Sequence, residues 1–378
     1  MSKDINKQEF DASTTLKLDI FRDSFEEWLP VFIHDQYTQG ILIMDFFAGS
    51  GTDAAGNPGS PLVLLDAAKG EDRRYCKKAS EKDIRFFFNE SMKGKNKKLE
   101  EAVKKHLSDC EQQEQCGGCC YQTFFEQKEF KDIFTSQEAQ RIFENTKYAK
   151  FILLDQYGFK QVDDEVFKKL ISYGKTDFIF FISSSTIKRF KEHEYTKAYI
   201  DTNKIKFDET LPSKCHRVIA DYFKSLIPEG KEYFLHHFSL KKETGNVYGL
   251  IFGSQHSLGM EKFIKVCWKY DGNSGESNFN IEGDYTEGEL FYTPETSNKK
   301  ERIKQELRED IMAGNIKSNK VGLKRTLHKG CEPRLFTEVV KELVKEKKIE
   351  ITAAKGKPSF ASTNIHKVNE YKIEVLAK

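Results

Sequence analysis

The sequence lacks the long apolar runs and the leader segment that mark membrane and secreted proteins. Its 378 residues contain no run of about 18 consecutive apolar residues, the length that a membrane-spanning helix needs. Residues 1–14 are polar and have no apolar centre of the kind found in a secretory signal. We therefore expect a cytoplasmic protein without a membrane segment.

A surplus of charge of one sign is also missing. Lysine and arginine together number 61, aspartate and glutamate 59, and the formal net charge is +2. This balance excludes a basic field over the whole chain, so any contact with nucleic acid must come from a local patch. The eight cysteines in a chain of this length do not form the pattern of a secreted disulfide framework.

What is present is an alternation of strand-like and helix-like segments after an amphipathic helix over residues 15–34. Short apolar runs alternate with amphipathic stretches between about residues 40 and 195. This order is typical of an α/β protein with a doubly wound parallel sheet of the Rossmann-like type. The strands are expected at residues 40–47, 84–89, 121–125, 151–154 and 177–182.

The second half of the chain predicts a hairpin and a smaller domain. Residues 233–241 and 247–253 fit two antiparallel strands, and the Gly-, Ser- and Asn-rich tract at 271–300 fits a domain boundary. We expect a Rossmann-like domain over residues 1–285 and a C-terminal winged-helix-like domain over 300–378. Three helical segments followed by two strands support the latter: 300–313, 321–327, 333–347, 348–353 and 370–376.

The sharpest motif is Asp45-Phe-Phe-Ala-Gly-Ser-Gly51 at the end of the first strand. Gly49 and Gly51 allow a tight strand-to-helix turn, whose amides can hold a polar ligand group. The motif lacks the third glycine of the dinucleotide fingerprint. It predicts S-adenosylmethionine binding through its methionyl part, by Asp45, Phe47, Ala48, Gly49 and Gly51. The alternative is a structural turn, or a turn that binds another nucleotide.

Acidic residues end the next three strands. Glu90 can bind both ribose hydroxyls of the cofactor, and Glu126 lies where adenine contacts are expected; the alternative for both is a solvated surface acid. Asp155 can orient a nucleophilic amine or hydroxyl, and Tyr157 can stack on a planar substrate, so we expect both to be catalytic. The alternative here is an ordinary turn before the next helix.

These motifs resemble, in order, the three-Cys-motif partner (TcmP) family. The similar stretches are residues 17–30, 45–51, 56–62, 155–158 and 248–268. The resemblance implies a class I S-adenosylmethionine-dependent methyltransferase fold. It also implies a neighbouring partner protein that carries three cysteines and resembles radical S-adenosylmethionine proteins. Gln156 departs from the pattern, because the family has proline at this position.

Four cysteines lie close together as Cys110-x5-Cys116-Gly-Gly-Cys119-Cys120, in an insert at about residues 108–120. The Cys116–Cys119 spacing is that of a zinc knuckle, which predicts a structural zinc site with these four residues as ligands. An iron–sulfur site, a redox disulfide and free thiols on a loop are the alternatives.

The C-terminal region is locally basic. Arg334 and Lys341 lie on the predicted third helix of this region, and Lys355 and Lys357 lie between the last two strands. In a winged helix these positions contact a DNA groove and the phosphate backbone. The alternative is a surface for protein contact.

We therefore expect a methyltransferase that acts on nucleic acid, in a defence, modification or repair setting. Two alternatives stay open. One is a methyltransferase for a small molecule or a protein, working with a partner. The other is a binding protein that keeps the fold without catalysis.

Overall fold

The computed structural model describes residues 8–70, 75–76, 82–111, 121–207, 210–283, 298–353, 356–361, 365–367 and 369–376. The chain divides into two compact units. The first comprises Met1–Tyr233 and Ser239–Gln255, and the second comprises Phe234–Phe238 and His256–Lys378. This division assigns residues 256–283 to the C-terminal unit, whereas the sequence analysis places them in the larger domain.

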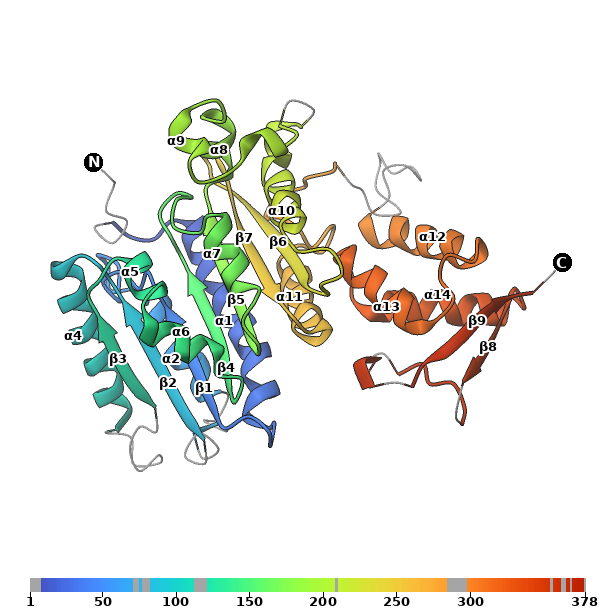
Figure 1. Cartoon of the computed structure of the whole chain (residues 1–378), viewed down its shortest axis with the longest axis horizontal. Helices are drawn as coiled ribbons and strands as arrows, with labels where there is room; N and C mark the ends of the chain where they lie inside the picture. Colours follow the sequence, from blue (N-terminus) through green and yellow to red (C-terminus); the bar gives the residue numbers. More distant parts are fainter. Residues whose placement is uncertain are drawn as a thin grey trace. The chain divides into compact units, whose positions relative to one another are not determined.

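A seven-stranded sheet of order β3-β2-β1-β4-β5-β7-β6 runs through the larger unit, and the first five residues of its edge strand β6 are the stretch Phe234–Phe238 that is counted with the second unit (Figure 1). Strands β1 to β5 are parallel to one another, and β7 is antiparallel to β5. Only five residues join β6 to β7, which makes this pair an antiparallel hairpin. The strands are β1 (Gly40–Asp45), β2 (Asp83–Asn89), β3 (Gln122–Glu126), β4 (Tyr148–Leu154), β5 (Thr176–Ile182), β6 (Phe234–Lys241) and β7 (Val247–Ser254).

Helices cover both faces of the sheet because its central strands are apolar on both sides. On one face, Phe25 of α1 packs against Phe86 and Phe151. On the other, Phe46 packs against Phe130 of α5 and Phe143 of α6. The first face carries α1 (Ala12–Ile33), α2 (Ser60–Lys69) and α4 (Lys93–Glu111). The second carries α5 (Phe130–Phe134), α6 (Gln137–Glu144), α7 (Asp164–Leu170) and α10 (Cys215–Ser225).

Short helices fill the connection between β5 and α10. They are α8 (Ser184–Arg189), α9 (Glu194–Lys197), η3 (Thr202–Lys204) and η4 (Pro212–Lys214).

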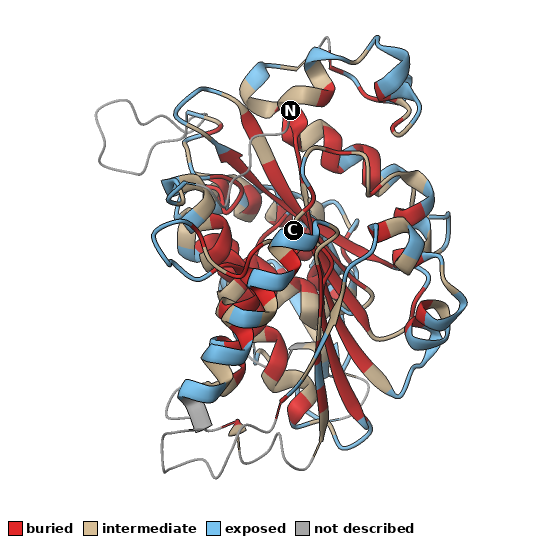
Figure 2. Ribbon diagram, turned by 90° about the vertical axis from the view of Figure 1, so that its left-hand side faces the viewer, coloured by how far each residue is buried: buried red, intermediate tan, exposed pale blue. Residues whose placement is uncertain are grey.

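Figure 2 shows the strands and the inner sides of the helices as buried, with the exposed residues on the outer sides. The doubly wound α/β arrangement predicted from the sequence is therefore confirmed.

The order of the strands reverses at β1, which pairs with both β2 and β4. In open α/β sheets, ligands bind outside the carboxyl ends of the strands at such a reversal. Asp45 and Leu153 are partners in the register, so the segments that follow β1 and β4 leave the sheet side by side. The glycine turn and the Asp155 segment are these two exits.

The second unit contains four helices and a ribbon among its described residues. The helices are α11 (Ser257–Tyr270), α12 (Lys299–Met312), α13 (Asn319–His328) and α14 (Pro333–Lys345). The antiparallel ribbon consists of β8 (Ile349–Ala353) and β9 (Tyr371–Val375), with the 3-10 helix η6 (Ile365–Lys367) between them. One apolar core joins these elements, and the ring of Phe336 lies so close to Gly322 that a Cβ there would meet it at 2.1 Å.

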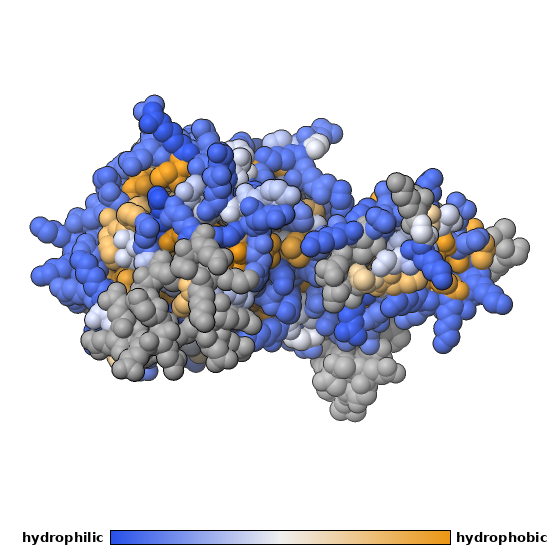
Figure 3. Space-filling view, turned by 90° about the horizontal axis from the view of Figure 1, so that it is seen from below, coloured by the Kyte–Doolittle hydropathy of each residue, from blue (hydrophilic) through white to orange (hydrophobic). Residues whose placement is uncertain are grey.

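No helix among the described residues is long and apolar enough to cross a membrane. Figure 3 shows hydrophilic residues over most of the face in view, with smaller hydrophobic areas between them.

Candidate active site

The glycine turn begins where β1 ends. Two backbone hydrogen bonds anchor it: the Phe46 amide donates to Leu153 at 3.2 Å, and the Ala48 amide donates to Asn89 at 3.0 Å. Gly49 and Gly51 both have left-handed backbones, with φ of 64° and 80°. A Cβ on Gly51 would lie 3.0 Å from Cβ of Ala102 in α4. The turn therefore needs glycine at both positions, as the sequence analysis predicts.

Three successive amides in this turn, those of Gly49, Ser50 and Gly51, have no hydrogen-bond partner among the described residues. Successive free amides in a tight turn bind anionic or polar groups. The residues present thus fit the polar methionyl end of S-adenosylmethionine.

Asp45 lies under this turn and is completely buried. Its Oδ1 accepts a hydrogen bond from the Phe47 amide at 3.1 Å, and its Oδ2 accepts one from the Ser60 hydroxyl at 2.6 Å. Burial raises the pKa of Asp45 to about 7; the nearby Asp155 adds to this, and the two hydrogen bonds and Lys17 oppose it. Asp45 therefore braces the turn against the start of α2.

A second loop closes the turn from the side. The Gly59 amide donates to the Gly51 carbonyl at 2.8 Å, and Thr52 pairs with Pro58. Asp53 holds the loop by accepting hydrogen bonds from the amides of Ala55 and Asn57, and from the Phe10 amide at 2.9 Å. The segment before α1 is thereby tied to the glycine turn.

The ends of β2 and β3 are linked through Asn89. Its side chain donates to the carbonyls of Phe46 and Lys128, at 3.1 and 3.0 Å. Glu90, the next residue, is half-buried and accepts a hydrogen bond from the Met92 amide at 2.8 Å. Glu126 ends β3 and forms an ion pair with Lys128 at 3.2 Å. Both predicted cofactor acids therefore lie at the carboxyl edge of the sheet, as does the glycine turn.

Asp155 follows β4 and forms an ion pair with Lys17 of α1. The Lys17 ammonium lies 2.5 Å from Asp155 Oδ2, with side chains that are 11% and 18% exposed. The same ammonium lies 5.0 Å from the centre of the Phe181 ring. Asp45 pairs in the register with Leu153, two residues before Asp155, so Asp45 and the Lys17–Asp155 ion pair lie at the same edge of the sheet.

Gln156 and Tyr157 have different roles in the loop after β4. The Gln156 side chain is buried; it donates to the Phe181 carbonyl at 3.0 Å and accepts from the amides of Gln161 and Val162 at 2.8 and 3.3 Å. These bonds stiffen the loop where the TcmP pattern has proline. Tyr157 is 66% exposed, so its ring is free to stack on a planar ligand.

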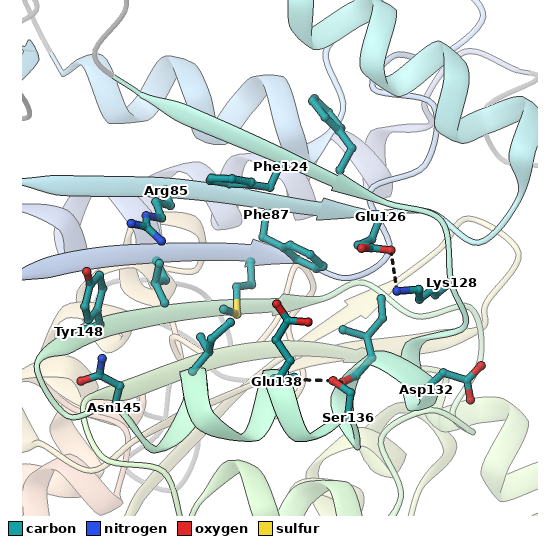
Figure 4. Close-up of a pocket in the computed structure, with 16 residues that line it drawn as sticks. Arg85, Phe87, Phe124, Glu126, Lys128, Asp132, Ser136, Glu138, Asn145 and Tyr148 are labelled. Atoms are coloured by element: carbon teal, nitrogen blue, oxygen red, sulfur yellow. Dashed lines mark hydrogen bonds and ion pairs between the residues drawn. The ribbon is translucent and has the colours of Figure 1, made fainter.

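A groove runs along the sheet face under α5 and α6, with a volume of about 540 Å³. Figure 4 shows Glu126 and Lys128 at one end, Arg85 and Tyr148 at the other, and phenylalanine rings between them. Neither Asp45 nor Asp155 lines it. Of the residues predicted to bind the cofactor, only Glu126 lines the groove.

The predicted metal ligands lie outside what the structure describes. Cys116, Cys119 and Cys120 are beyond the described residues, as is the side chain of Cys110, which belongs to α4. Within the described part of the chain, no three His, Cys, Asp or Glu side chains form a metal-binding group.

The predicted nucleic-acid residues belong to the second unit. Arg334 is 76% exposed on α14 and pairs with Glu338 at 2.9 Å. The Lys341 ammonium lies 5.8 Å from the centre of the Phe360 ring. Lys357 is exposed in the connection between β8 and β9, and Lys355 is outside the described residues.

Sequence reasoning missed three side chains of the site: Lys17, Ser60 and Asn89. Lys17 could have been found from the sequence, because it lies four residues before Phe21 and eight before Phe25, on the apolar face of the predicted first helix. A lysine at such a position points to a buried charge. Ser60 and Asn89 gave no such signal, since their partners come from other elements.

No family model matches the chain, and no curated protein matches it. Among solved structures it is similar to TYW2 of M. jannaschii in complex with AdoMet, at 11% identity over 66% of this chain and 78% of that one, with a TM-score of 0.30. It is similar to the O-methyltransferase from Bacillus cereus in complex with SAH at 14% identity, over 65% of this chain and 90% of that one, with a TM-score of 0.31. It is also similar to TomG, an O-methyltransferase from Streptomyces achromogenes in complex with SAM, at 10% identity over 64% of this chain and 90% of that one, with a TM-score of 0.31.

The sheet order, the antiparallel β7 and the helices on both faces together form the Rossmann-like fold of class I methyltransferases.

Proposed function

We propose that the chain is an S-adenosylmethionine-dependent methyltransferase. The observation that carries the proposal is that Asp155 and an exposed Tyr157 leave the sheet beside the glycine turn, in which three amides have no hydrogen-bond partner among the described residues. When bound, S-adenosylmethionine supplies an electrophilic methyl group on its sulfonium. The chain itself has to hold the cofactor, orient an acceptor and shield the site.

Each task has a residue. The amides of the glycine turn hold the methionyl end, and the carboxylate of Glu90 accepts hydrogen bonds from the ribose hydroxyls. Asp155 accepts a hydrogen bond from the amine or hydroxyl that is to be methylated, which orients the lone pair. Tyr157 stacks on a planar acceptor, and Gln156 keeps the loop that carries both residues rigid.

We further propose a nucleic-acid acceptor, bound by the C-terminal unit as a winged helix. Three helices followed by a two-stranded ribbon support this, and the backbone of Lys317 and Ser318, just before α13, also bonds to β9. Arg334 can leave Glu338 for a phosphate without isolating that carboxylate, because Lys304 also pairs with Glu338 at 2.7 Å.

Transfer of tritiated methyl from S-adenosylmethionine to DNA and RNA pools tests the proposal. We expect incorporation by the wild type and a loss of about 100-fold or more in Asp155→Ala, which removes the acceptor, since an oriented hydrogen-bond acceptor contributes a factor of this order. Labelling of a protein or small-molecule fraction instead would favour the alternative acceptors. Cofactor binding without transfer to any fraction would favour a non-catalytic binding protein.

Loss of positive charge on the C-terminal unit is expected to weaken nucleic-acid binding. The double variant Arg334→Ala/Lys357→Ala should lower the slope of log affinity against log salt by about one to two, since each removed phosphate contact lowers it by about one. The control is Lys97→Ala, an exposed lysine of α4 that pairs with Glu101. Equal slopes for the double variant and the control would contradict a phosphate-binding role.

A further inference from the structure

Lys17 is an unusual residue for its place in the fold. It lies on the buried stripe of α1, and its ammonium is enclosed by Asp155 and the ring of Phe181. Burying a lysine and an aspartate costs desolvation that their mutual attraction seldom outweighs. A charged pair in such a place, beside backbone amides that have no hydrogen-bond partner among the described residues, therefore calls for a functional explanation.

The charges around Lys17 match those of an amino-acid head group. Asp45 and Asp155 provide negative charge and Lys17 provides one positive charge. The Lys17 ammonium lies 2.5 Å from Asp155 Oδ2, and Asp45 pairs in the sheet register with Leu153, two residues before Asp155. A free amino acid carries an α-ammonium and an α-carboxylate on one carbon. Such a ligand is complementary to a site that offers charges of both signs side by side.

We propose that Lys17 binds the α-carboxylate of the cofactor's methionyl part. The inference rests on the proposed function and deepens it. The α-ammonium then faces the negative charge of Asp45, and the amides of the glycine turn donate further hydrogen bonds to the methionyl part. A carboxylate that shares the Lys17 ammonium also loosens the ion pair with Asp155. Asp155 thereby becomes available to the methyl acceptor only once the cofactor is bound.

The rival explanation is that Lys17 only ties α1 to the end of β4. The two roles differ in what a substitution does to ligand selectivity. A structural tie affects all adenosine ligands alike, whereas a carboxylate-binding lysine affects only ligands that carry the amino-acid head.

Titration calorimetry with two probes separates them. S-adenosylhomocysteine carries the amino-acid head, and 5′-methylthioadenosine has the same adenosine and a thioether but lacks it. We expect Lys17→Met to weaken S-adenosylhomocysteine binding by about 30-fold, the order expected for one charge-assisted hydrogen bond, and to leave 5′-methylthioadenosine within about twofold. Lys17→Arg, which keeps the cation, should recover part of the loss.

The matched control is Lys69→Met. Lys69 is similarly enclosed, with a side chain 16% exposed, and pairs with Asp66 at 2.9 Å, but it lies at the far end of α2 from Ser60. If Lys17→Met does not fold, the double variant Lys17→Gln/Asp155→Asn replaces the ion pair by a neutral pair and takes its place in both titrations.

Equal weakening of both probes, or no change in S-adenosylhomocysteine binding, would overturn the inference and leave the proposed function standing. A wild-type protein that binds neither probe would overturn the proposed function and the inference together.

Discussion

Asp45→Asn is expected to make the protein more stable above pH 7 and, at the same time, to weaken cofactor binding. Burial raises the pKa of Asp45 to about 7, so the folded protein keeps a proton that the unfolded chain has already lost. The stability that this proton contributes is complete below about pH 4, the ordinary carboxyl pKa, and is lost as the pH rises to about 7. Above pH 7 the wild type therefore carries the full cost of a buried carboxylate.

Asparagine keeps the shape of the side chain without the charge. We expect the free energy of unfolding of Asp45→Asn to exceed that of the wild type by about 4 kcal/mol at pH 8 and by about 2 kcal/mol at pH 5, from the size of the pKa shift. Urea unfolding across this pH range measures the difference. Asp177 has a raised pKa of about 6 in both proteins, so its contribution cancels. If the free energies of unfolding of the two proteins differ by the same amount from pH 5 to pH 8, the raised pKa of Asp45 is contradicted. The control is Asp109→Asn, at an exposed position of α4.

The effect on binding has the opposite sign. The Asp45 carboxylate attracts the cofactor's ammonium, so its neutralisation should weaken S-adenosylmethionine binding by about tenfold or more, the equivalent of about 1.4 kcal/mol. For the same reason the wild-type affinity should fall as the pH drops below 7, where Asp45 takes up a proton. Unchanged affinity in Asp45→Asn would leave Asp45 with a purely structural role. A gain in stability that accompanies a loss of binding is typical of a charge kept for function.

Gln156→Leu is expected to lower the free energy of unfolding by about 2–4 kcal/mol although it keeps the volume of the side chain. The substitution leaves the Phe181 carbonyl and the amides of Gln161 and Val162 without the partner that they now share. Unpaired polar groups in a buried loop are costly, and this loop carries Asp155 and Tyr157. Urea unfolding at pH 7 gives the change in free energy.

Gln137→Leu is the control for this substitution, because Gln137 is exposed in the first turn of α6. A cost for Gln156→Leu no larger than that of Gln137→Leu would show that the loop holds without the three hydrogen bonds. The expected result would mean that the buried Gln156 amide holds this loop through its three hydrogen bonds.

Much of the fold could be predicted because its signals are local. Each predicted strand from 84–89 to 247–253 overlaps an observed one, since runs of apolar residues between turn residues suit buried strands. Helix α2 was not predicted. Its sequence, Ser-Pro-Leu-Val-Leu-Leu-Asp-Ala-Ala-Lys, is apolar almost throughout and lacks the polar face that reveals a surface helix. Helix α5 has only five residues, too few for a helical period to be read.

By itself, the sequence determined that the chain is an α/β protein, where its strands end, and that a glycine turn and several acids follow those ends. These properties depend on neighbouring residues and on backbone conformations that only glycine adopts readily. The tertiary structure alone decided which side chains meet there. Lys17 reaches Asp155 across 138 positions, Ser60 reaches Asp45, and Gln156 reaches the end of β5. Burial and charge pairing depend on distance in space, so the raised pKa of Asp45 and the enclosed Lys17 emerge only when α1, β1 and β4 pack together.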